Sequence, residues 1–136
     1  MSPKAPPASR KPAPAAPGAL LVVAAIMGWL LPGGGHLALR RLGRGAVGLA
    51  TIAILFAAGV AFEGEIPRPE RGSLLSYGKT FACLGLGPSY FIARGQVRGD
   101  SASVTSEYGN TLLYAAGLLN MLLILDAYDI AAGRKS

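Results

Sequence analysis

The residues able to do chemistry in this sequence are few and far apart. The chain has one histidine, His36, and one cysteine, Cys83. A nucleophile–base pair would have to join these two, yet Cys83 lies inside an apolar run, where a buried and unreactive thiol is typical. No other pair of side chains stands at a catalytic spacing. We therefore predict that the protein is not an enzyme and that it holds neither a metal nor a cofactor.

Glycine-rich segments give only partial matches to nucleotide-binding motifs. Gly72 precedes Gly78-Lys79-Thr80, but five residues separate them where a phosphate-binding loop has four, and no strand comes before. The runs at 33–35 and 85–87 lack the third glycine and the strand of a dinucleotide site. These glycines are therefore predicted to break apolar helices.

Polar residues within apolar stretches are the remaining candidates. Asp126 and Asp129 are three residues apart, on one face of a helix. They either share a proton or a cation, or mark the end of an apolar segment and pair with Arg134 and Lys135. Ionisable groups at membrane depth are candidates for ion or solute coupling. The set considered for that role is Lys79, Asn120, Asp126 and Asp129.

Two segments of the chain match when Arg40 is aligned with Arg94. Each has a glycine, a polar ring three residues later, and two arginines at the following four-residue intervals. If each segment is helical, its polar ring and its two arginines lie on one face of the helix. The match reflects either a duplicated element or the common use of glycine breaks and arginine ends in membrane proteins. Because anionic headgroups attract juxtamembrane basic groups, we predict headgroup contacts by His36, Arg40, Arg44, Tyr90, Arg94 and Arg98.

The composition indicates what positions these residues. The chain has 136 residues, enough for one domain, with 51% hydrophobic and 15% charged residues and a mean hydropathy of +0.43. In soluble domains about a quarter of all residues are charged. Because this chain has a much smaller charged fraction, a water-soluble globule is excluded. The net charge of +6 comes from a tail and from basic residues flanking apolar runs. A nucleic-acid partner is excluded because no basic surface interleaved with aromatic residues is present.

Four apolar stretches predict an all-α integral membrane bundle of about four hydrophobic helices. They cover residues 19–39, 45–62, 74–93 and 111–125, the last continuing to 133. Glycine and proline break the first and third. Since about 20 residues span a bilayer, the first is either a broken spanning helix or a short insertion followed by an interfacial helix. Residues 1–18 form a predicted disordered, Pro/Ala-rich basic tail, 19–133 one transmembrane domain, and 134–136 a basic end.

The order of the stretches also predicts a topology. The loops at residues 40–44 and 94–98 are separated by two hydrophobic segments, 45–62 and 74–93. If both segments cross the membrane, the two arginine loops face the same compartment.

The segment WLLPGGGHLALRRLGRG, residues 29–45, resembles the small two-transmembrane-helix domain, over residues 20–62. It departs from that family at Leu37 and Ala38, where the family has a Phe-Tyr pair. The whole chain, including NMLLILDAYDIAAGRK at 120–135, is similar to uncharacterised small bacterial multi-helix membrane proteins. The resemblance implies a helix hairpin in a bacterial inner membrane and no established activity.

These observations favour a small, non-enzymatic integral membrane protein. We expect a scaffold, assembly or interaction subunit that contacts anionic lipid headgroups and packs with itself or with another membrane protein. The alternative is an ion- or solute-coupling transport component that uses Lys79, Asn120, Asp126 and Asp129.

Overall fold

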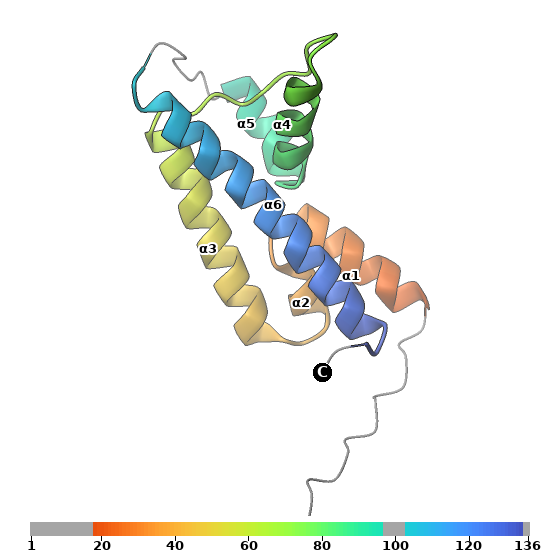
Figure 1. Ribbon diagram of the computed structural model, residues 1–136. Coiled ribbons are helices and arrows are strands. Elements are labelled where there is room, and N and C mark those ends of the chain that lie inside the picture. Colours follow the sequence, from red (N-terminus) through yellow and green to blue (C-terminus); the bar gives the residue numbers. More distant parts are fainter. Residues whose placement is uncertain (1–17, 97–102, 135–136) are drawn as a thin grey trace, which may run out of the picture.

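The computed structural model describes residues 18–96 and 103–134 (Figure 1). Over these residues the chain forms six helices and no strand. The predicted tail lies almost wholly outside the described residues. The helices are α1 (Gly18–Leu30), α2 (Gly34–Ala38), α3 (Leu42–Ala61), α4 (Leu74–Leu84), α5 (Pro88–Gln96) and α6 (Ser106–Ala131).

The two long helices, α3 and α6, pack side by side in opposite directions. Gly48 of α3 lies against Leu123 of α6, whereas Gly59 lies against Leu113, so the order of contacts reverses. Both helices are long and apolar enough to cross a membrane. Two helices pass this test, rather than the four hydrophobic helices predicted, because the first and third stretches are divided into short pieces.

The first stretch turns back on itself. After α1, Gly33 adopts a left-handed conformation with φ of 75°, which a glycine takes without steric cost. The chain then reverses, and α2 returns along α1 with Gly34 against the carbonyl of Met27 and Gly35 against that of Ala24. The first stretch is therefore not one continuous helix, and α2, predicted in one alternative as an interfacial helix, is packed against α1 with Gly34, Gly35 and His36 buried.

The third stretch makes a similar reversal. Gly87 has φ of 65° between α4 and α5. Ser73 caps the start of α4, its side chain accepting a hydrogen bond from the Ser76 backbone N–H. The Tyr90 hydroxyl of α5 donates to the Pro67 carbonyl, 3.1 Å away, so α5 returns toward the loop from which α4 starts. The segment 74–93 is therefore a bent pair of short helices and not one spanning helix.

The same order of elements thus occurs twice: a short helix, a turn with a left-handed glycine, another short helix and a long apolar helix. Because α3 and α6 are antiparallel, the two halves are inverted relative to each other. Figure 1 shows α1, α2 and the start of α3 at one end of the bundle, and α4, α5 and the start of α6 at the other. Inverted repeats with broken helices are characteristic of many secondary transporters.

This arrangement bears on the predicted topology. The connection at residues 40–41 lies at the end of the bundle where α6 finishes, whereas α5, with Arg94, lies at the end where α6 starts (Figure 1). Only α3 runs from one end to the other between them. The two arginine segments therefore lie at opposite ends of the bundle, whereas the predicted topology requires the segment 74–93 to run from one end to the other.

The core is built from small residues and a few large ones. Gly117 of α6 lies directly against the Ala82 carbonyl of α4, and Gly85 against the Gly117 carbonyl, so any side chain at these glycines would push the helices apart. Small residues allow this close approach of helices in lipid. The buried cluster around the contact consists of Ile52, Ile66, Cys83, Leu86, Tyr90, Ala93, Leu113 and Ala116.

Candidate functional site

The polar centre of the bundle is Asn120, at the middle of α6. Its side chain is fully buried. The Nδ2 atom donates hydrogen bonds to the carbonyl oxygen of Gly28 in α1, at 3.1 Å, and to that of Gly85 after α4, at 2.7 Å. Carbonyls at the C-terminal end of a helix have no partner within the helix. Asn120 therefore holds the C-terminal ends of α1 and α4 against α6.

A second hydrogen bond joins the two halves at the same place. The indole Nε1 of Trp29, near the end of α1, donates to the Leu84 carbonyl at the end of α4, 3.2 Å away. Gly87 also lies directly against the Trp29 carbonyl. The two half-repeats thus meet end to end, through backbone atoms, beside Asn120. We call this meeting point the central junction.

His36 and Asp126 form a pair at the end of the bundle where α6 finishes. His36 Nε2 and Asp126 Oδ2 are 3.0 Å apart, and the His36 side chain is 1% exposed. The pair joins α2 to α6. His36 is buried in protein, which removes it from the predicted headgroup contacts.

The predicted continuous face of His36, Arg40 and Arg44 is also wrong. The helix ends at Ala38, and Arg40 has φ of 57°, outside helical geometry. Arg44 belongs to the next helix, α3. A regular four-residue spacing places residues on one face only while the helix is unbroken.

The two aspartates of α6 contact different partners. Asp126 meets His36, while Asp129 Oδ1 accepts a hydrogen bond from Arg134 Nη1 at 3.4 Å. The predicted pairing with Arg134 is present, and Lys135 lies outside the described residues. The geometry favours the interpretation that Asp129 marks a helix end, whereas the contact of Asp126 with a histidine 90 residues away was not foreseen.

The remaining predicted residues lie at both ends of the bundle. Tyr90 is 2% exposed, and its hydroxyl bonds to Pro67, so its side chain is also removed from the headgroup set. Arg40, Arg44 and Arg94 are exposed. Arg98 lies outside the described residues. Lys79 is exposed on α4 near the loop between α3 and α4.

The two aspartates are expected to differ in their effect on stability. Asp126→Ala leaves the buried His36 ring without its partner, which costs about 1–3 kcal/mol. Asp129→Ala removes an exposed ion pair worth at most about 1 kcal/mol. Thermal unfolding of detergent-purified protein, followed by circular dichroism, measures both losses. A larger loss for Asp129→Ala would contradict this assignment.

Comparison with known proteins places the chain in a family. A model of a family of unknown function, DUF6677, matches residues 23–136, and the chain belongs to that family. The match begins inside α1 and so covers nearly all of both half-repeats. Neither a curated protein nor a solved structure matches the chain.

Proposed function

We propose that this member of the DUF6677 family is a small integral membrane protein with a non-enzymatic scaffold or assembly role, in the cytoplasmic membrane of a bacterium. The observation that carries the membrane proposal is the exposure of the two long helices. Only 22% of the apolar window of α3 and 28% of that of α6 is buried within the protein. The core helix of a soluble protein would be mostly buried, whereas lipid-facing helices expose apolar side chains.

The helix lengths also fit a bilayer. With a rise of about 1.5 Å per residue, the 20 residues of α3 extend about 30 Å, the thickness of the hydrocarbon core. The 13 residues of α1 and the 11 of α4 extend about 20 Å and 17 Å, which is less than the thickness of the hydrocarbon core. In the proposed arrangement α3 and α6 cross the membrane, and the two short-helix pairs enter from opposite sides and turn at mid-depth.

The exposed arginines support contact with anionic lipid. Arg40 and Arg44 lie just before and at the start of α3, at one end of the bundle, and Arg94 lies in the last turn of α5, which is at the other end. Each basic group near an anionic surface contributes about 1 kcal/mol of attraction. A bundle with an apolar girdle between charged ends would be held at a fixed depth and could present its surface to a second copy or to another membrane protein.

The transport alternative receives less support from the geometry. Lys79 lies near one end of the bundle, Asp126 and Asp129 near the other. Between them Asn120 is fully buried, with its amide engaged by backbone carbonyls. The two hydrogen bonds donated by its Nδ2 atom give Asn120 a structural role, while its buried Oδ1 atom has no hydrogen-bond partner among the described residues.

Two measurements test the proposal. The expressed protein is expected to remain in the membrane pellet after an alkaline carbonate wash, and recovery in the soluble fraction would overturn the membrane assignment. In mild detergent, Arg40→Gln combined with Arg44→Gln is expected to lower co-purified anionic lipid about thirtyfold, from two contacts of about 1 kcal/mol each. Arg134→Gln is the matched control, because that guanidinium already contacts Asp129. The scaffold role predicts a second copy or a protein partner in the same preparation.

A further inference from the structure

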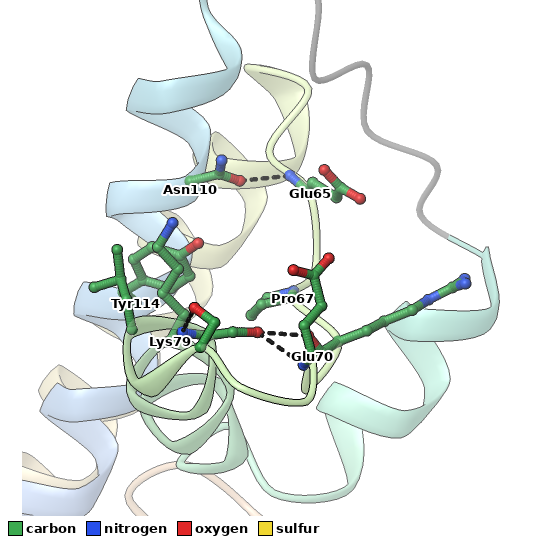
Figure 2. Close-up of a pocket in the computed structure, with 10 residues that line it drawn as sticks. Glu65, Pro67, Glu70, Lys79, Asn110 and Tyr114 are labelled. Carbon is green, nitrogen blue, oxygen red and sulfur yellow. Dashed lines mark hydrogen bonds between the residues drawn. The ribbon is translucent and has the colours of Figure 1, made fainter.

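A polar hollow of about 220 Å³ lies at the end of the bundle that carries the α3–α4 loop. Figure 2 shows Glu65 and Glu70 on the loop side of this hollow, across from Lys79 of α4 and Tyr114 of α6. Arg68 also lines it. We call this feature the loop hollow. Both carboxylates and both basic side chains are solvent-exposed.

The wall of the loop hollow is held in place by three helices. Asn110 Oδ1 of α6 accepts a hydrogen bond from the Glu65 N–H at 2.6 Å. The Tyr90 hydroxyl of α5 donates to the Pro67 carbonyl. From α4, Ser76 Oγ donates to the Arg68 carbonyl at 2.8 Å and accepts from the Glu70 N–H at 3.1 Å. A binding site held by such supporting contacts loses little conformational freedom when a ligand binds.

The residues that line the loop hollow carry charges of both signs, and these charges do not neutralise each other. Among residues 18–96 and 103–134, neither carboxylate, Glu65 or Glu70, forms an ion pair with Arg68, Lys79 or any other basic group. The volume is below the range of about 300–1,000 Å³ that holds drug-sized ligands. A small ligand that carries one positive and one negative group would match both the volume and the charges.

We propose that the loop hollow binds a phosphoethanolamine group. The primary ammonium has three N–H donors, which suit the carboxylates of Glu65 and Glu70 and the Tyr114 hydroxyl. The phosphate accepts hydrogen bonds from Lys79 and from the planar guanidinium of Arg68. The group comes either from a phosphatidylethanolamine headgroup or from free phosphoethanolamine. The lipid source rests on the proposed membrane function, and the free source does not.

Choline provides the sharpest comparison ligand. Phosphocholine has the same phosphate and the same positive charge, but its trimethylammonium group has no N–H to donate. Loss of charge-assisted hydrogen bonds weakens binding by about tenfold or more. We therefore expect the full-length protein in non-ionic detergent to bind phosphoethanolamine at least about tenfold more tightly than phosphocholine or inorganic phosphate in isothermal titration calorimetry.

Point variants test the assigned roles. Glu70→Gln and Lys79→Gln are each expected to weaken phosphoethanolamine binding by about tenfold. Glu63→Gln and Arg71→Gln each remove one charge of the same sign from the segment between α3 and α4, outside the loop hollow, and are expected to leave binding unchanged. All four positions are exposed, and circular dichroism checks that each variant is folded.

A second arm identifies the source of the group. The protein is reconstituted in vesicles of phosphatidylcholine with or without phosphatidylethanolamine, and bound lipid is quantified after mild extraction. Enrichment of phosphatidylethanolamine that Glu70→Gln abolishes supports the lipid source, and binding of the free compound alone supports the soluble one. Equal binding of phosphocholine, an equal loss in Glu63→Gln, or binding of neither form overturns the proposal. Retention of the protein in the carbonate-washed pellet and co-purification of anionic lipid are measured separately. A failure of phosphoethanolamine binding is therefore distinguishable from a failure of the proposed function.

Discussion

Asn120→Leu is expected to destabilise the protein by about 2–4 kcal/mol, because two carbonyl oxygens at the central junction lose their donor. Leucine has the same branching as asparagine and leaves no cavity, so the loss reports the hydrogen bonds to Gly28 and Gly85 together with the cost of fitting two larger methyl groups. Thermal unfolding in detergent measures the loss, which corresponds to a midpoint shift on the order of 10 °C. Asn120→Asp tests the same contacts with a side chain of identical shape, and the carboxylate would face two carbonyl oxygens without an N–H.

Trp29 provides a local reporter for this prediction. It is the sole tryptophan of the chain, and its indole N–H contacts Leu84 at the junction. Its emission spectrum is expected to change in both Asn120 variants. The control is Asn110→Leu, which removes one exposed hydrogen bond at the far end of the same helix and costs at most about 1.5 kcal/mol. Equal shifts at the two asparagines, with unchanged Trp29 emission, would show that the junction is not held by Asn120.

The apolar segments and the positions of their breaks were predictable from the sequence. An uncharged run predicts a helix, and the glycine turns at Gly33 and Gly87 end the short helices near the predicted places. Helix periodicity describes one segment at a time, and a break contains no information on where the chain goes next. The reversals after α1 and α4 therefore required the structure, and with them the count of helices able to cross a membrane.

The alignment of the two half-repeats was visible, but its meaning was not. His36 and Tyr90 both stand three residues after a left-handed glycine, and both are buried with a hydrogen bond to a distant segment. The polar ring of each half therefore holds the returning short helix, α2 or α5, in place. A ring buried for this purpose is not exposed to lipid headgroups. The partners, Asp126 and the Pro67 carbonyl, lie 90 and 23 residues away in the chain, where no local spacing rule applies.

The inversion of the halves leads to the second large effect, which concerns topology. Single cysteines at Leu42 and Val104 are expected to react with an impermeant thiol reagent from opposite sides of the membrane. Leu42 is 67% exposed at the start of α3, and Val104 is 89% exposed just before α6. Between these positions only α3 crosses in the proposed arrangement, because the α4–α5 pair returns to the side it entered from. On intact cells or spheroplasts one position should be labelled and the other protected until the membrane is permeabilised.

The experiment needs a background without the native thiol. Cys83 is buried in the core, and Cys83→Ala removes it without introducing a buried hydroxyl. A cysteine at Arg134, just after α6, is the matched control and should be labelled from the same side as Leu42, since α3 starts where α6 ends.

Labelling of Leu42 and Val104 from the same side would mean that the α4–α5 segment crosses the membrane. Since the 11 residues of α4 extend only about 17 Å of the roughly 30 Å required, α5 would then have to continue in the direction of α4. That geometry would break the bond from Tyr90 to Pro67 and remove the inverted symmetry of the two halves.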